Sequence, residues 1–219
     1  MQQNDNPGRG RILARIQKGL RNPAPKHAPV DKSGAIFAPI VDPLDRFQKE
    51  CGQNGTECLI VPNAAAVAEA FERLLEPIPP GEIFVQDAPE LRPMAALRRN
   101  DRSIRWSTEG RPAEQSQATV TLAEALVAQT GSIFVSAACG GRAASVVAPV
   151  HILVASIQQL VPDLGAAFER LRERGAVENN SMLCLITGPS RTADIEKIIV
   201  MGAHGPRRVV VILSLEPLS

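Results

Sequence analysis

The chain has 219 residues and a net charge of +1, and 44% of its residues are hydrophobic against 21% charged. This length predicts one main domain with a substantial core, and the small net charge gives no electrostatic argument for binding nucleic acid or an anionic membrane. No apolar stretch approaches the ~20 residues of a membrane span, and the polar N-terminus lacks a signal-peptide core, so we expect a cytoplasmic protein.

The first predicted element is a short amphipathic helix over residues 9–20. Its apolar residues recur at helical spacing: Ile12, Leu13, Ile16 and Leu20. From Arg9 to Lys26 the chain is basic without an acidic residue, which indicates either a solvated face or a docking face for an acidic partner. Prolines then predict an extended linker over residues 22–42, so the helix must dock on its own domain or on a partner.

Residues 43–219 form the second predicted unit, in which helices and strands alternate. The expected helices cover residues 43–51, 64–76, 89–98, 121–129, 163–174 and 192–201. The expected strands cover residues 57–61, 82–86, 103–106, 132–137, 151–155, 182–187 and 208–215. This alternation, with a core that must be aliphatic because aromatic residues make up only 3%, predicts an α/β fold with a mostly parallel sheet and helices on both faces.

The four cysteines predict neither a metal site nor a bound cofactor. Cys51, Cys58, Cys139 and Cys184 form no C-x-x-C pair, and the chain has no G-x-G-x-x-G dinucleotide fingerprint. Reduced thiols are the simplest interpretation.

The most informative motif is the stretch from Thr187 to Glu196, which lies between two apolar runs. Gly188 and Pro189 favour a tight turn, and Thr192 is a suitable N-cap for the helix that we expect to follow. Arg191 and the free amides could then bind a carboxylate or phosphate, with Ser190 beside them. The alternative is structural, with Arg191 paired to an acidic residue of that helix's first turn.

His204 follows the same predicted helix. Its imidazole is suited either to acid–base chemistry near neutral pH or to capping the last carbonyls of the helix. His151 opens a strand, where a buried structural histidine is the favoured interpretation.

Two further turns carry groups that could bind a ligand. Thr130 and Ser132 offer hydroxyls in the turn that begins at Gln129, although the same residues are typical of a structural turn. Gly140 and Gly141, in the loop from Cys139 to Arg142, permit close approach of the backbone to an anion, although a flexible loop explains them equally.

Several of these motifs resemble the LUD-domain family, and within it the lactate utilisation protein C group. Thr187–Glu196 followed by Gly202–Pro206 is similar to the family's C-terminal signature. Three other segments resemble its opening helix, its Ala-Glu-Thr-Gly-Thr turn and its Leu-Pro-x-His-Ile motif, respectively Arg11–Ile16, Ala128–Ser132 and Ala148–Val154. The resemblance implies a three-layer α/β/α fold similar to ribose-phosphate isomerases and CoA transferases.

The resemblance also implies a role in bacterial oxidation of L-lactate to pyruvate together with iron–sulfur partner proteins. We therefore predict an accessory or ligand-binding subunit, with no cofactor bound by this chain and the iron–sulfur clusters in its partners. The alternative is a stand-alone enzyme that acts on a phosphosugar, an acyl-CoA or a similar anionic metabolite. Gln129 stands where the family has Glu, which weakens CoA-transferase-like chemistry because an amide is no nucleophile. No catalytic residue can be assigned from the sequence.

Overall fold

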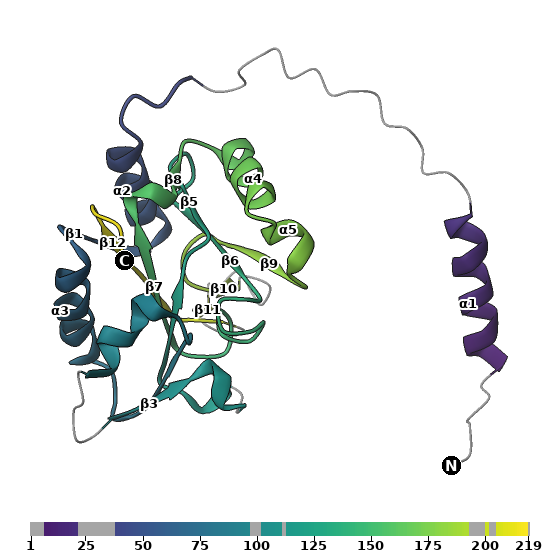
Figure 1. The fold of residues 1–219 in the computed structure, drawn as a ribbon, viewed down its shortest axis with the longest axis horizontal. Coiled ribbons are helices and arrows are strands. Elements are labelled where there is room, and N and C mark those ends of the chain that lie inside the picture. The colour runs from purple at the N-terminus through teal and green to yellow at the C-terminus, as the bar shows by residue number, and fades with distance from the viewer. Residues whose placement is uncertain are drawn as a thin grey trace. The chain divides into compact units, whose positions relative to one another are not determined.

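A computed structural model describes residues 7–21, 38–96, 102–110, 113–192, 200–201 and 205–218 (Figure 1). The chain divides into two compact units, residues 1–39 and 40–219. The first contains helix α1 (Pro7–Leu20), whose isoleucine and leucine side chains are all exposed. Most of the predicted linker, residues 22–37, lies outside the described residues.

The second unit is built on a six-stranded sheet in which every pair of neighbouring strands is parallel. In spatial order the strands are β1 (Glu57–Val61), β12 (Arg208–Ser214), β7 (Val150–Ser156), β4 (Ala118–Leu122), β2 (Gly81–Val85) and β3 (Arg102–Trp106). This sheet and its flanking helices confirm the predicted α/β class. The three central strands are buried along almost their whole length, which explains their continuous aliphatic runs.

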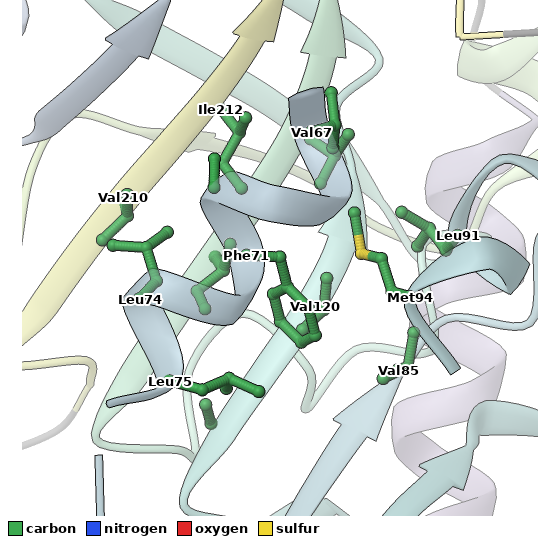
Figure 2. Close-up of a cluster of buried hydrophobic side chains, with 14 of the residues drawn as sticks. Val67, Phe71, Leu74, Leu75, Val85, Leu91, Met94, Val120, Val210 and Ile212 are labelled. Atoms are coloured by element: carbon green, nitrogen blue, oxygen red, sulfur yellow. The ribbon is translucent and has the colours of Figure 1, made fainter. Parts of the chain in front are cut away.

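One face of this sheet is covered by α3 (Ala64–Leu75) and the 3-10 helix η1 (Pro89–Ala96). Asn63 caps α3, since its Oδ1 accepts from the amide of Ala66 at 3.1 Å. Figure 2 shows Phe71 of α3 among side chains from the strands, including Val120 and Ile212, while Leu91 and Met94 of η1 extend the same core. The helix predicted over residues 89–98 is thus a tighter 3-10 helix, with Pro93 inside it, and its last two residues lie outside the described part of the chain.

The opposite face of the central sheet carries a second, four-stranded sheet and helix α2 (Pro43–Asn54). The four strands, in spatial order, are β8 (Leu160–Val161), β5 (Ala125–Val127), β6 (Ser132–Ser136) and β9 (Leu183–Ile186). Helices α4 (Leu164–Glu173) and α5 (Ala176–Asn179) cover the far side of this sheet, where the rings of Phe134 and Phe168 meet edge to face at 5.3 Å. Three short 3-10 turns connect these elements: η2 (Ser107–Glu109), η3 (Ala113–Gln115) and η4 (Ile157–Gln159).

The helix predicted over residues 121–129 is wrong. These residues end β4 and form β5, even though their alanines, leucines and glutamate favour a helix. Every side chain from Ala125 to Ala128 is fully buried, because β5 lies between the central sheet on one side and α4 on the other. Burial on both faces requires a strand here and overrides the local propensity.

The helix predicted over residues 192–201 is wrong at both ends. Strand β10 (Arg191–Thr192) pairs antiparallel with β11 (Val200–Met201), so Thr192 is not a helix N-cap. The first residue of β11, Val200, is the last of three consecutive β-branched residues that begin at Ile198, and such a run favours a strand over a helix. Residues 193–199, with Asp194 and Glu196, lie outside the described part of the chain. Among the described helices, none has the length and apolar character needed to cross a bilayer.

Candidate functional site

Two of the predicted motifs meet at the start of strand β6. Ser132 opens β6, and Thr187 follows the antiparallel strand β9 directly opposite it. Their hydroxyl oxygens lie 2.7 Å apart, and the hydroxyl oxygen of Thr130 lies 2.8 Å from that of Ser132. We call Thr130, Ser132 and Thr187 the hydroxyl cluster.

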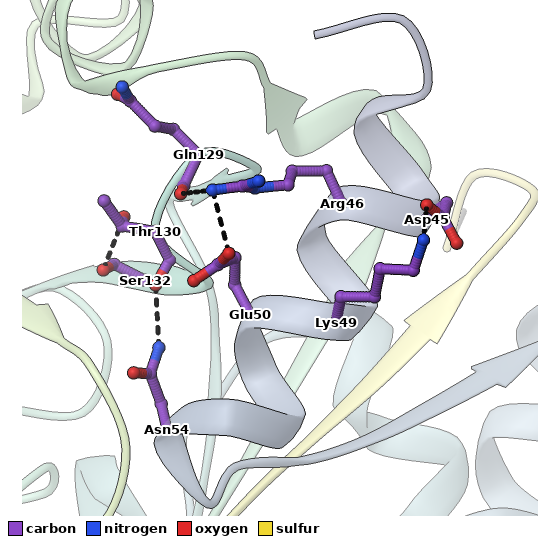
Figure 3. A network of polar contacts seen from close by, with 8 residues as sticks. All are labelled: Asp45, Arg46, Lys49, Glu50, Asn54, Gln129, Thr130 and Ser132. Carbon is purple, nitrogen blue, oxygen red and sulfur yellow. Dashed lines mark hydrogen bonds and ion pairs between the residues drawn. The ribbon is translucent and has the colours of Figure 1, made fainter.

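Helix α2 packs against the turn that carries Thr130 and Ser132 (Figure 3). The side-chain amide of Asn54 donates to the carbonyl of Thr130 at 2.8 Å, and Arg46 reaches both the carbonyl of Gln129, at 3.4 Å, and the carboxylate of Glu50, at 2.9 Å. Arg191 donates to the backbone carbonyl of Asn54 at the end of α2. A cation bound to a terminal carbonyl complements the helix dipole, so the observed partner of Arg191 is structural.

Two glycines allow this close packing. A Cβ on Gly131 would lie 2.6 Å from the amide nitrogen of Cys51, and one on Gly188 would lie 2.3 Å from the carbonyl oxygen of Asn54. The turns from Gln129 to Ser132 and from Thr187 to Arg191 therefore press directly on the end of α2. Their polar groups are bound to one another and to the backbone, which makes this region a structural joint between the second sheet and α2.

The other predicted site residues lie apart from the hydroxyl cluster. Ser190 donates its amide to the carbonyl of Pro206 at 2.8 Å and packs beside Gly205. Gly140 and Gly141 lie beyond the far end of β6, about 15 Å along a five-residue strand. Thr192 belongs to β10, and His204 lies outside the described residues. The structure therefore does not gather the predicted residues into one pocket.

A cavity of about 370 Å³ opens instead at the carboxyl ends of four parallel strands, β2, β4, β7 and β12. This is the edge at which open α/β sheets usually bind ligands. We call it the carboxyl-end cavity. Its lining residues are Gln86, Glu90, Leu122, Ala123, Glu124, Cys139, Ser156, Gln158, Gln159, Arg170, Arg174, Pro217 and Leu218. The loop with Gly140 and Gly141 borders it through Cys139.

Glu124 is the acidic group that follows β4 in this cavity. Its Oε1 accepts from the hydroxyl of Ser136 at 2.7 Å and lies 3.7 Å from the thiol of Cys139. Burial, foremost, raises the pKa of the Cys139 thiol, and the nearby Glu124 charge raises it further. Cys139 is therefore a neutral hydrogen-bond donor to Glu124 near neutral pH, and it is poorly suited to act as a nucleophile.

Arg170 of α4 and Arg174, the C-cap of that helix, bring positive charge to the same cavity. The Nε of Arg170 is buried, and it has no hydrogen-bond partner among the described residues. Burial, foremost, lowers the pKa of Arg170 from its usual value and repulsion from Arg174 adds to this effect, while attraction to Glu124 and Glu173 opposes it in part. Two like charges four residues apart, close to a cavity, form a site that an anion would stabilise.

Two glutamines of the wall are occupied by the fold itself. Gln86 accepts from the amide of Leu122 at 2.7 Å and donates to the carbonyl of Ala138 at 3.4 Å. Gln159 accepts from the amide of Ser156 at 2.7 Å and donates to the carbonyl of Ala123. They hold the strand ends in place, which leaves the charged residues and Gln158 to meet a ligand.

The comparisons with known proteins agree with the fold and with the motifs. A family model described as the LUD domain matches residues 44–214. This chain belongs to the LUD domain family. Lactate utilization protein C of Macrococcus caseolyticus is 24% identical over 221 residues, which span 94% of this chain and 95% of that protein. The protein of the same name from Geobacillus kaustophilus is 28% identical over 190 residues, 78% of each chain.

A solved structure also resembles this LUD domain. The crystal structure of a DUF162 family protein from Deinococcus radiodurans matches with a TM-score of 0.62 at 21% identity, covering 78% of this chain and 96% of that one. At this identity the likeness establishes the shared fold alone. The family resemblance found in the sequence is confirmed by the LUD-domain model and by the relatives named lactate utilization protein C.

Sequence reasoning missed Glu124, Arg170 and Arg174 in the LUD domain. Glu124 was placed within a predicted helix over residues 121–129 and was assigned no role. The available signal was a lone carboxylate in the otherwise uncharged run from Ala118 to Ala128. The arginines carry no such signal, because alternating charges on an amphipathic helix usually indicate a solvated face. Among the described residues, no group of three or more His, Cys, Asp and Glu could hold a metal ion.

His151 is a buried structural residue on the second-sheet side of β7. Its Nε2 lies 2.9 Å from the hydroxyl of Thr121 on β4, and its side chain is fully buried. Burial lowers the pKa of His151 to about 4, so the imidazole is neutral in the folded protein near neutral pH.

We expect Gly188→Ala to destabilise the LUD domain by about 3 kcal/mol or more. The added Cβ would clash with the end of α2, and alanine would also have to adopt the positive φ of 89° that Gly188 has. The matched control is Gly141→Ala, which has a φ of 95° but no atom within 4 Å of the added Cβ, and should cost only about 1–2 kcal/mol. Urea unfolding measures both. An equal decrease in the free energy of unfolding of the two variants would contradict the close packing of Gly188 on α2.

We expect His151 to make the domain less stable in acid. The unfolded histidine binds a proton below pH 6.5 but the folded one only below about 4, so the free energy of unfolding falls as pH drops through this window. The full effect is about 3 kcal/mol. Urea unfolding from pH 7 to pH 4 should therefore show a flatter profile for His151→Gln than for the wild type. Parallel profiles would mean that His151 titrates normally in the folded protein.

Proposed function

We propose that this LUD-domain protein is the ligand-binding accessory subunit of a bacterial, cytoplasmic system that oxidises L-lactate to pyruvate. The observation that carries a ligand-binding role is the carboxyl-end cavity, in which Arg170 and Arg174 face Glu124 without an ion-pair partner among the described residues. The lactate pathway is supported by relatives that align along most of the chain and are named lactate utilization protein C.

Iron–sulfur partner proteins carry the electrons in this proposal. The four cysteines of the chain are spread over separate elements, and the two that are close in sequence, Cys51 and Cys58, are already packed between α2 and β1. The Cys51 thiol donates to the carbonyl of Gly131 at 3.7 Å, and the adjacent Cys58 thiol, followed by burial, raises the pKa of Cys51. This chain contributes the binding of a small anionic metabolite and contacts with the partners.

The alternative function is a stand-alone enzyme that acts on a phosphosugar, an acyl-CoA or a similar anionic metabolite. The observation in its favour is Glu124, which supplies the cavity with the carboxylate that Gln129 cannot provide. Glu124 keeps its second oxygen, Oε2, free of hydrogen bonds to the described residues, so it is available to a ligand. An enzyme of this kind would turn over its substrate without partner proteins, which separates the two functions.

Helix α1 is the proposed docking element for the partner proteins. Its exposed apolar residues form one stripe, while Arg11, Arg15 and Lys18 recur on another face. We expect deletion of residues 1–22 to abolish co-purification of the tagged protein with its partners from the native host, because the stripe would be lost. The thermal midpoint of the remaining domain should stay unchanged, since α1 belongs to a separate compact unit. Undiminished co-purification would exclude α1 as the docking element.

We expect loss of the gene to abolish lactate-dependent pyruvate formation in extracts of the native host, and the intact gene to restore it. Complementation with the double variant Arg170→Gln, Arg174→Gln should fail, because the cavity would lose both cations. The control is Arg172→Gln, which changes an exposed arginine on the same helix outside the cavity. Unchanged pyruvate formation without the gene would remove the chain from this pathway.

A further inference from the structure

The ligand of the carboxyl-end cavity can be specified from its size and charge. Resting on the ligand-binding function proposed above, we propose that it is a phosphorylated polyol, such as a sugar phosphate, and that lactate is not its main ligand. Three properties of the wall support this class: its volume, its unpaired cations and the acceptors that face them.

The volume exceeds what lactate would fill. A cavity of about 370 Å³ has room for about a dozen water molecules at ~30 Å³ each. A three-carbon acid such as lactate displaces roughly three or four of these, which leaves most of the wall in contact with water. Cavities of this size typically enclose larger metabolites and bury most of their surface.

The positive charge of the wall corresponds to a phosphate group. Arg170 and Arg174 together carry two charges, and neither guanidinium group makes an ion pair within 4 Å of a described carboxylate, although Glu124 and Glu173 attract Arg170 from farther away. A phosphate monoester carries about −1.5 to −2 charges and has three acceptor oxygens, whereas a carboxylate carries one charge and two oxygens. A phosphate therefore balances both guanidinium groups, and it also provides an acceptor for the buried Nε of Arg170.

The other charged groups of the wall require hydrogen-bond donors on the ligand. Glu124 and Glu90 are acceptors when ionised, and Glu124 offers an unused Oε2. A hydroxyl donates to such a carboxylate, whereas a second anionic group would be repelled. Gln158 adds a side-chain amide that makes no hydrogen bond to the described residues and can bind hydroxyls as donor or acceptor. The ligand must thus combine one anionic end with several hydroxyls, which is the chemistry of a polyol phosphate.

The test is isothermal titration of the full chain with inorganic phosphate, glycerol 3-phosphate, glucose 6-phosphate and L-lactate. We expect affinity to rise from inorganic phosphate to glucose 6-phosphate, with L-lactate at least tenfold weaker than glucose 6-phosphate. Arg174→Gln should weaken all phosphates by about tenfold, since it removes one charge-assisted contact. Arg172→Gln, the neighbouring exposed arginine, should leave them unchanged.

Glu124→Gln separates the two halves of the site. It should weaken glucose 6-phosphate by about tenfold and leave inorganic phosphate within twofold, because only the sugar carries hydroxyls for the carboxylate. Tighter binding of L-lactate than of any phosphate, lost in Arg174→Gln, would overturn the polyol phosphate and leave the ligand-binding function intact. Absence of binding by every probe to a folded wild-type chain would overturn the inference and remove the cavity from the proposed function, while the extract experiment would still decide the pathway.

Discussion

The burial of strand β5 on both faces is the constraint on which the rest of the domain depends. Leu126 packs against the central sheet, while Ala125 and Val127 pack against α4. Strand β5 therefore packs the second sheet against the central sheet on one face and against α4 on the other. Because Glu124 immediately precedes β5 and Arg170 lies on α4, the same packing brings a carboxylate and a guanidinium to one cavity.

The glycine-containing family motifs and the carboxyl-end cavity lie at opposite ends of the second sheet. The turns that contain Gly131 and Gly188 press on α2, where Arg191 binds the helix's terminal carbonyl. Their short sequences are recognisable because close approach requires glycine at these positions. The cavity, at the other end of β6, is lined by glutamines, glutamates and arginines for which no such backbone restriction exists. A signature motif can therefore identify this fold while lying away from the place where ligand chemistry is expected.

The sequence predicted most helices and strands of the domain because their patterns are local. Phe71 and its neighbours at helical spacing identify α3, and the aliphatic runs identify β7 and β12. It failed over residues 121–129, where burial on two faces decided between a helix and a strand of similar composition. It also failed at Thr192 and Val200, which pair antiparallel, since a strand of two residues is too short to show a periodic pattern.

The candidate site was the hardest part to predict for the same reason. Glu124 and Arg170 are separated by 45 residues of sequence and meet only because β5 lies between two layers. The pair Arg170 and Arg174 shows how such a site can be recognised once the fold is known. Like charges four residues apart destabilise a helix slightly, and partial burial adds to that cost. Attraction to Glu124 and Glu173 offsets part of this cost, and an anion bound in the cavity would offset more of it and raise the stability of the domain.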